Sequence, residues 1–253
     1  MDFLNKKIHM IGIKGVGMTA LVELLKNAGA IISGSDVGEE FHTDQVLRRL
    51  NIHVLNFAAS NVNPDFDLVI YSSAYSEDHP EREEAHRLGI KEASYAEVLS
   101  AIFNKKRGVM VAGSHGKTTT TALLGEIMIV AGFDPTVVVG GTVVGWDSNV
   151  RLGKSDWMII EGDEYQEKFL NFKPEYLLIT NIDYDHPDTF PTKKSYREAF
   201  QKLTLQTSKK VFTSGKIESL NIEVFKPFYS NYLFGEHNKK NLNLVLALCR
   251  ELG

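Results

Sequence analysis

The chain has 253 residues, 43% hydrophobic and 24% charged, which is typical of a globular protein and not of a disordered or fibrous one. That length suits two α/β domains better than one. The formal net charge is −4, from 28 basic and 32 acidic residues, so we expect no nucleic-acid partner held by bulk electrostatics. An anionic ligand must be held by local groups, such as backbone N–H donors, a lysine or a metal ion.

The single cysteine and the N-terminal residues indicate the compartment. Cys249 excludes an intrachain disulfide, and its apolar helical surroundings favour a core residue over a nucleophile. Lys6 and Lys7 precede a short apolar run that Gly12 interrupts, which is neither a signal peptide nor a membrane span. We therefore expect a cytoplasmic protein without a membrane partner.

The first hundred residues alternate between strand-like and helix-like stretches. The expected strands are 8–13, 30–33, 53–55 and 67–72. The expected helices are 16–28, 43–50, 80–88 and 95–103, with a short segment at 90–93 between the last two. This rhythm predicts a Rossmann-like parallel sheet that helices cover on both faces.

A polar, basic stretch at 104–108 separates this region from a second periodic region. A solvated loop is the alternative, but the second strand–helix rhythm after it favours a domain boundary, with domains 1–105 and 106–253. The expected strands of the second domain are 109–112, 157–161, 176–180, 210–213 and 222–224. Its expected helices are 118–131, 193–207 and 239–252. We predict a P-loop-type α/β domain.

The strongest functional motif is the loop at 112–121, between a strand and a helix. Gly113 and Gly116 allow backbone N–H groups to face a phosphate, and the helix N-terminus adds its dipole. Lys117 can reach the terminal phosphates, and the Thr118 hydroxyl can bind Mg²⁺. The strict P-loop pattern requires glycine where this chain has Val111, so the loop is a variant. The alternative is a helix start without a ligand.

Two further candidates follow buried strands of the same domain. Glu161 ends a strand beside the loop, where a second metal ligand is expected, although Asp163 and Glu164 would also fit a solvated acidic turn. His186 follows the next strand, and a neutral ring nitrogen there can bind a metal. A lone histidine after a strand is more often structural, but the pairing with Glu161 and Lys117 favours a ligand.

The first domain carries a second glycine-rich turn. Gly12, Gly15 and Gly17 lie between the first strand and the first helix, where a diphosphate can approach the helix N-terminus. Their spacing differs from the dinucleotide fingerprint, which argues against simple NAD binding. Polar residues that end neighbouring strands and can line the same crevice, or serve as turn residues, are Asp36, Ser72 and Ser73.

The last expected helix opens on a polar motif at 235–241. Asn238 can cap this helix, which is the simpler interpretation. An asparagine can also recognise the donor and acceptor edge of a nucleotide base.

Together these motifs resemble those of the Mur ligase family, and the resemblance covers nearly the whole chain in the family's order. The stretches that carry it are 11–18, 33–36, 71–74, 112–121, 134–141, 161–165, 180–186 and 235–241.

The resemblance implies that the first domain binds UDP-N-acetylmuramate and that the second binds ATP with Mg²⁺. The implied UDP-sugar residues are Gly12, Lys14, Gly15, Val16, Gly17, Asp36, Ser72 and Ser73. The implied ATP residues are Gly113, Ser114, His115, Gly116, Lys117, Thr118, Thr119, His237, Asn238 and Asn241. The implied metal ligands are Thr118, Glu161 and His186, and the implied catalytic residues are Lys117, Glu161 and His186.

The implied reaction joins an amino acid or a peptide to UDP-N-acetylmuramate in peptidoglycan synthesis. The muramoyl carboxylate attacks the γ-phosphate of ATP, and an amine then displaces phosphate from the resulting acyl phosphate. Mg²⁺ and Lys117 would offset the repulsion between carboxylate and triphosphate.

The chain departs from the family pattern in three places. Lys14 stands where the family usually has glycine, and Phe200 stands where some relatives carry a carbamylated lysine, which favours the branch that adds L-alanine. The chain ends after the helix that follows the adenine-side motif, so we expect the C-terminal, amino-acid-binding domain to be absent.

The spacing of 25 residues between Glu161 and His186 (186 − 161) matches the alanine-adding branch. A tripeptide-recycling ligase is the first alternative, because residues 161–165 resemble that branch. A non-catalytic module that binds UDP sugar and ATP is the second alternative, because the third domain is expected to be missing.

Overall fold

The computed structural model describes residues 2–213 and 235–253. It divides into two compact units. The first holds Met1–Ile102 with Asp147–Val150, and the second holds Phe103–Trp146 with Arg151–Gly253. Within the described ranges, no helix is long and apolar enough to cross a membrane.

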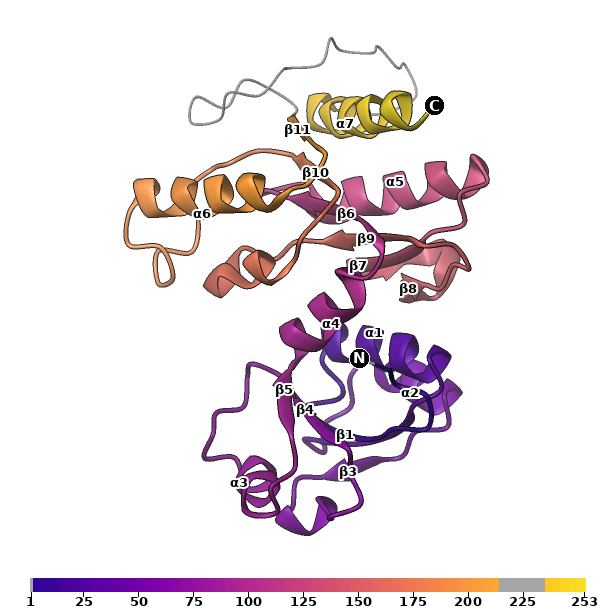
Figure 1. Ribbon diagram of the computed structural model, residues 1–253, viewed down its shortest axis with the longest axis vertical. Coiled ribbons are helices and arrows are strands. Elements are labelled where there is room, and N and C mark those ends of the chain that lie inside the picture. Colours follow the sequence, from indigo (N-terminus) through magenta and orange to yellow (C-terminus); the bar gives the residue numbers. More distant parts are fainter. Residues whose placement is uncertain (1, 214–234) are drawn as a thin grey trace. The chain divides into compact units, whose positions relative to one another are not determined.

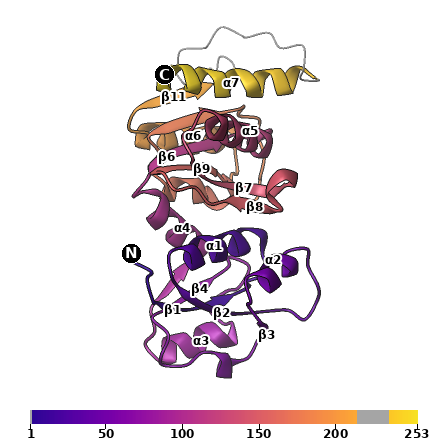
Figure 2. The same ribbon diagram turned by 90° about the vertical axis from the view of Figure 1, so that its right-hand side faces the viewer.

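The first unit is built on a five-stranded sheet in the order β3-β2-β1-β4-β5, and its strands are parallel (Figure 1). The strands are β1 (Lys7–Ile11), β2 (Ile31–Asp36), β3 (Val54–Asn56), β4 (Leu68–Tyr71) and β5 (Glu92–Ser94). The helices are α1 (Val16–Asn27), α2 (Asp44–Arg49), the 3₁₀ helix η1 (Ala59–Asn61), α3 (Pro80–Arg87) and α4 (Tyr95–Phe103). Helices α1 and α2 lie on one face of this sheet, and α3 lies on the other (Figure 2).

Strand β1 lies at the centre of the sheet, and this position explains why its sequence is apolar without alternation. It pairs with β2 on one side and β4 on the other, and helices cover both faces, so Ile8, Met10 and Ile11 are fully buried. The register sets Ile11 opposite both Ser35 and Tyr71. The segments that follow β1, β2 and β4 therefore leave the sheet at the same edge.

A polar network lies inside the first unit. Glu81 of α3 is fully buried and accepts hydrogen bonds from the Ser35 hydroxyl, from Asn61 Nδ2 at 2.6 Å and from the Ala58 N–H at 3.1 Å. His9, also fully buried, lies with Nε2 3.4 Å from the same carboxylate. Burial alone would raise the pKa of Glu81, but these hydrogen bonds hold it below its ordinary value.

The second sheet has the order β11-β10-β6-β9-β7-β8. Its strands are β6 (Arg107–Ala112), β7 (Thr136–Val143), β8 (Ser148–Arg151), β9 (Trp157–Glu161), β10 (Tyr176–Ile179) and β11 (Lys210–Thr213). The helices are α5 (Lys117–Val130), η2 (Val144–Trp146), η3 (Tyr165–Asn171), α6 (Lys193–Gln206) and α7 (Glu236–Leu252). Strand β6 pairs in parallel with both β9 and β10, and β7 and β11 extend the parallel arrangement.

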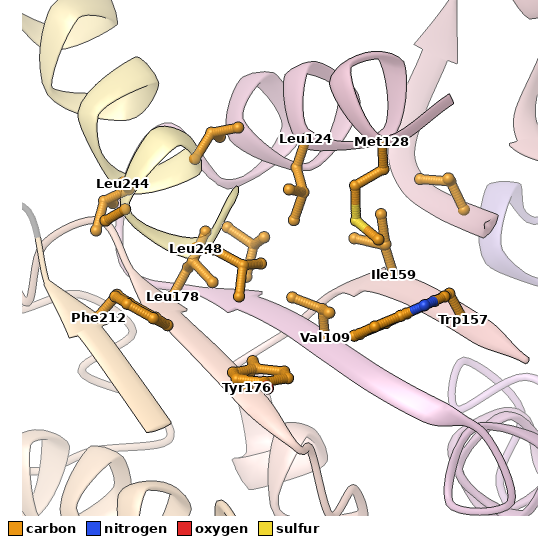
Figure 3. Packing of buried hydrophobic residues seen from close by; sticks show 14 of the residues in the cluster. Val109, Leu124, Met128, Trp157, Ile159, Tyr176, Leu178, Phe212, Leu244 and Leu248 are labelled. Carbon is orange, nitrogen blue, oxygen red and sulfur yellow. The ribbon is translucent and has the colours of Figure 1, made fainter. Parts of the chain in front are cut away.

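Helices α5 and α7 cover one face of this sheet with a continuous apolar core (Figure 3). Its residues come from both helices and from the strands: Val109, Leu124, Met128, Ile159, Leu178, Phe212, Leu244 and Leu248. Each is at most 1% exposed, and truncating one such leucine to alanine typically costs about 2–5 kcal/mol. This core holds α5, which follows the loop after β6, against the sheet.

Helix α6 packs against its neighbours through aromatic side chains. Phe169 of η3 meets Phe200 edge to face at a centroid distance of 5.2 Å, and Tyr196 lies between Phe200 and Phe190 at 5.2 and 5.0 Å. Phe200 is fully buried. Phe200 is therefore part of the hydrophobic core.

The expected fold class is confirmed: two α/β arrangements with parallel strands follow each other along the chain. Strands β7 and β8 were not expected, because a valine run that ends in Gly140 and Gly141 shows neither alternation nor a clear boundary. The expected strand at 222–224 lies outside the described residues. Burial raises the pKa of the Cys249 thiol, as expected of a packed residue.

The Glu81 network predicts a pH-dependent stability. A carboxyl group whose pKa is lowered on folding stabilises the fold fully above its unfolded pKa, about 4.3, and this contribution is lost as the pH falls through the lower folded value. We expect Glu81→Gln to lower the free energy of unfolding by about 2 kcal/mol at pH 7. The difference from the parent chain should shrink below about pH 4, as urea unfolding across that pH range would measure.

The matched control is Glu83→Gln, on the same helix but exposed. It should change neither the stability nor its pH dependence. A deficit for Glu81→Gln that stays constant down to pH 3 would contradict the assignment.

Candidate functional site

The loop between β6 and α5 is shaped by close contact with the end of β10. Gly113 has φ +134°, and a β-carbon built there would overlap Thr180 Oγ1 and come within 2.8 Å of the Asn181 carbonyl oxygen. The Ser114 N–H donates to Asn181 O at 3.2 Å, and the His115 N–H donates to Asn181 Oδ1 at 2.9 Å. The Thr180 hydroxyl donates to His115 O at 2.6 Å. These bonds fix the loop before any ligand arrives.

The Ser114 side chain takes part in this support. Its hydroxyl donates to Asp183 O at 2.5 Å, accepts from the Asp183 N–H at 2.9 Å and lies 2.8 Å from the Tyr196 hydroxyl. Burial raises the pKa of Tyr196, although the bond to Ser114 opposes this, so the phenol is protonated at neutral pH. Asn181 takes the N–H groups of Ser114 and His115. The N–H groups at the start of α5 have no intrahelical acceptor and are available to an anion.

Lys117, the first residue of α5, folds back over the loop. Its ammonium donates to Gly113 O at 2.6 Å and to both carboxylate oxygens of Glu164, at 2.9 and 3.1 Å. Glu164 is 1% exposed. His186 Nε2 lies 3.6 Å from Glu164 Oε1. The structure thus brings Lys117 and His186 together around the carboxylate of Glu164, a residue for which a solvated acidic turn was the alternative interpretation.

Thr118 and Glu161 form a second group at the loop. The Thr118 hydroxyl lies 3.0 Å from both oxygens of the Glu161 carboxylate, which also accepts from the Gly140 N–H at 2.7 Å. Glu161 is in place because β9 pairs with β6, with Glu161 opposite Val111. Hydroxyl and carboxylate oxygens are ligands that Mg²⁺ prefers.

These oxygens fit a magnesium ion that a phosphate also binds. Within the part of the chain that the structure describes, no group of three or more His, Cys, Asp or Glu could hold a metal alone. Mg²⁺ usually takes only one or two protein ligands and completes its shell with substrate phosphates and water. Thr118 and Glu161 match that pattern.

Helix α7 brings Asn241, an expected adenine-side residue, to the loop. Asn241 is 6% exposed, and a β-carbon built at Gly116 would lie 3.1 Å from its amide nitrogen and oxygen. The His237 ring lies against Gly235 at the start of the helix.

The glycine turn of the first unit lies between the first strand, β1, and the first helix, α1, where the sequence places it. The N–H groups of Gly12 and Ile13 donate to Ser35 O at 2.9 and 3.1 Å, and the Gly15 N–H donates to Gly12 O at 3.2 Å. Gly15 precedes α1, which begins at Val16. This turn therefore presents the N-terminus of α1 at the edge where β1 and β2 end.

The Lys14 side chain, expected at the diphosphate, is bound to the segment after β2. Its ammonium donates to Val37 O at 2.9 Å and Glu39 O at 2.7 Å and pairs with Asp44 at 3.5 Å. Its N–H donates to Asp36 Oδ2 at 2.7 Å. The side chain fastens the segment after β2 to the glycine turn.

The serines after β4 differ in their surroundings. The Ser72 N–H donates to Ile11 O at 3.0 Å, beside the turn, whereas Ser73 is exposed. Tyr75 lies against Gly12 and donates to Asp36 Oδ1 at 3.4 Å. Burial and the Asp36 charge raise the pKa of Tyr75. Sequence reasoning did not single out Tyr75.

Sequence reasoning also did not predict that Glu164, Thr180 and Asn181 support the loop. The signal for Thr180 and Asn181 was present, because they directly follow β10, a neighbour of β6 in a parallel sheet. Glu164 carried a weaker signal: one acid among several after β9 gives no indication of which is buried.

The fold and the loop define a class of protein: an α/β protein in which a glycine-rich, phosphate-binding type of loop joins a parallel strand to a helix. Residues 7–107 match the Mur ligase family, catalytic domain, and residues 111–244 match the Mur ligase middle domain. The chain belongs to the Mur ligase family.

Several named ligases are similar to this chain. It is 46% identical to the UDP-N-acetylmuramate–L-alanine ligase of Desulfitobacterium hafniense, over 97% of this chain and 64% of that protein. It is 38% identical to the ligase of the same name from Bdellovibrio bacteriovorus, over 95% of this chain and 53% of that protein. The chain thus spans less than two thirds of the length of either curated relative.

Two solved structures share the fold. The UDP-N-acetylmuramate:L-alanyl-gamma-D-glutamyl-meso-diaminopimelate ligase from Neisseria meningitides matches with a TM-score of 0.89 and 25% identity, over 98% of this chain and 94% of that chain. The UDP-N-acetylmuramate–alanine ligase from Thermotoga maritima matches with a TM-score of 0.83 and 29% identity, over 98% and 65%.

The packing around Gly113 predicts a large effect of a small substitution. In Gly113→Ala the new methyl group would overlap Thr180 and strain a positive φ, so we expect a loss of about 2–3 kcal/mol in the free energy of unfolding. Gly132→Ala is the matched control, because Gly132 has φ +83° with open space around it. It should cost about 1–2 kcal/mol from backbone strain alone. Equal losses in urea unfolding would show that the contact with Thr180 is unimportant.

Proposed function

We propose that this chain supplies the UDP-sugar-binding part (residues 1–105) and the ATP-binding part (residues 106–253) of a UDP-N-acetylmuramate–L-alanine ligase of peptidoglycan synthesis. The observation that carries the proposal is the arrangement of Lys117, Thr118 and Glu161 on a preformed loop, in a chain that is 46% identical to a ligase of that name. Because both substrates are cytoplasmic nucleotides, the proposal places the protein in the cytoplasm.

In this proposal the loop and its neighbours bind ATP. The N–H groups that begin α5 face the phosphates, Lys117 contacts the β- and γ-phosphates, and Asn241 lies on the adenine side. The other residues proposed for ATP binding are Gly113, Ser114, His115, Gly116, Thr118, Thr119, His237 and Asn238. Ser114 contributes through the shape of the loop, since its hydroxyl is engaged with Asp183 and Tyr196.

Mg²⁺ would supply positive charge to the phosphates, held by Thr118 and Glu161 at one position and by His186 at a second. Glu161 already lies beside the Thr118 hydroxyl, with the Gly140 N–H orienting its carboxylate. The His186 ring lies beside Glu164, and Tyr165 supports it at a centroid distance of 5.2 Å.

The glycine turn of the first unit is the proposed UDP-sugar site. The residues assigned to it are Gly12, Lys14, Gly15, Val16, Gly17, Asp36, Ser72 and Ser73. The N-terminus of α1 would face the diphosphate. We assign Lys14 an indirect contribution, because its ammonium and its N–H are both engaged with segment 36–44.

The chemistry follows from these positions. A carboxylate oxygen of the muramoyl group attacks the γ-phosphorus, the bond to the bridging oxygen breaks and ADP leaves. The amine of L-alanine then attacks the acyl phosphate, loses a proton and releases phosphate, which leaves an amide. Lys117 contributes by stabilising the charge that develops on the transferred phosphoryl group.

The tripeptide-recycling ligase remains the second candidate because the Neisseria structure, which bears such a name, shares this fold with a TM-score of 0.89. The two candidates are separated by phosphate release with ATP, Mg²⁺ and UDP-N-acetylmuramate. We expect stimulation by L-alanine and none by L-alanyl-γ-D-glutamyl-meso-diaminopimelate. The reverse result would favour recycling, and binding of both nucleotides without turnover would favour the non-catalytic module.

The role of Lys117 has its own test. Lys117→Ala removes the ammonium that meets the phosphates, so we expect ATP affinity to fall at least about tenfold in calorimetric titration, because hydrogen bonds between charged groups contribute about 1.5–3 kcal/mol each. Lys168→Ala is the control, since Lys168 is paired with Asp163 near the same segment. Unchanged ATP affinity in Lys117→Ala would refute the assigned role.

A further inference from the structure

The ammonium of Lys117 already has an anionic partner in this structure. Glu164 holds it with both carboxylate oxygens, and the same ammonium also donates to Gly113 O inside the loop. Glu164 is 1% exposed, so water does not screen its charge. A phosphate that enters the loop meets a lysine already engaged and a buried negative charge directly behind it.

The buried charge of Glu164 disfavours a metal-free nucleotide more than a nucleotide that carries a divalent cation. A metal-free nucleotide would bring its phosphate charge next to the Glu164 carboxylate and compete with it for Lys117, and such a juxtaposition of like charges is costly beside a carboxylate that is closed to water. A nucleotide that arrives with a divalent cation brings compensating positive charge. His186 Nε2 lies 3.6 Å from this carboxylate, beyond hydrogen-bonding distance, and compensates its charge less than Lys117 does.

We propose that Glu164 is a specificity-determining residue that makes the loop select the metal–nucleotide complex over the free nucleotide. This inference rests on the proposed function, in which the loop binds ATP. Glu164 acts here through Lys117 and through its own charge, as a positioning residue that sets which charge state of the ligand the loop accepts.

The test compares nucleotide binding with and without metal in Glu164→Gln. Glutamine keeps the size of the side chain and an oxygen that can accept from Lys117, but removes the charge. We expect the dissociation constant for ADP in excess EDTA to fall at least about tenfold relative to the parent chain. With 5 mM Mg²⁺ present, roughly the concentration needed to saturate ADP, the constant should change by less than about threefold. The measurement is calorimetric titration of ADP under both conditions.

The matched control is Glu167→Gln, three residues further along the same segment. Glu167 is half-exposed and paired with Lys202 at 3.1 Å, away from Lys117. Its substitution should leave both dissociation constants unchanged. Glu164→Asp withdraws the carboxylate by one methylene and should change the metal-free constant in the same direction by less, which provides a second measurement if the glutamine variant is poorly folded.

Two results would overturn the inference. Equal weakening of both constants in Glu164→Gln would mean that Glu164 is needed to hold Lys117 in position or to bind the metal. No change in either constant would mean that its charge does not reach the ligand. Failure of the parent chain to bind ADP with Mg²⁺ is a separate outcome, which would refute the proposed ATP site itself and this inference with it.

Discussion

The parallel pairing of β6 with a strand on each side is the constraint on which the second unit depends. Because β9 and β10 run in the same direction as β6, their carboxyl ends lie on either side of the loop that leaves β6. Glu161 therefore reaches Thr118 from one side, and Asn181 reaches the loop backbone from the other. A slip of one residue in either ladder would turn these side chains to the opposite face of the sheet.

The first unit uses the same constraint with different side chains. Strand β1 lies between β2 and β4, so the glycine turn after β1 meets Asp36 and the residues that follow Tyr71. Here the loop backbone is held by a carboxylate that accepts two N–H groups, from Lys14 at 2.7 Å and Val37 at 2.8 Å. In the second unit the side-chain amide of Asn181 holds the loop in the corresponding way. Both turns are fixed by a polar side chain that ends a neighbouring parallel strand.

The sequence was sufficient to predict those elements and positions that hydrophobic periodicity and strand order determine. Helix α4 and strands β9 and β11 begin and end at the predicted residues, and the positions of Lys117, Thr118 and Glu161 follow from strand–loop–helix order. What it could not give depends on contacts between distant segments. From the sequence, Lys14 is expected to contact a phosphate. In the structure, its ammonium donates instead to the carbonyl oxygens of Val37 and Glu39.

Glu164 shows the same limit more sharply. In the sequence it is one acid in an acidic turn, and hydropathy favours solvent exposure for it. Only the packing of η3 beside α6 places it against Lys117 and closes it from water. Burial of a charge requires a partner, and the partner here is the lysine that the loop motif offers to a phosphate. The burial of Glu164 in the fold therefore depends on an ion pair with Lys117, a residue of the candidate site. Sequence periodicity does not predict such a pair.

Under the proposed function, the charge arrangement of the loop also explains how a chain with net charge −4 would hold a polyanion. The two side chains that the proposal assigns to the phosphate and its metal have carboxylate partners in this structure: Lys117 has Glu164, and Thr118 has Glu161. Binding is then an exchange of partners, in which the net gain is the difference between two sets of hydrogen bonds and is much smaller than either set. A site that works by exchange gains little from a ligand that cannot supply a new partner for the displaced carboxylates. The selectivity of such a loop therefore lies in its acidic residues as much as in its lysine.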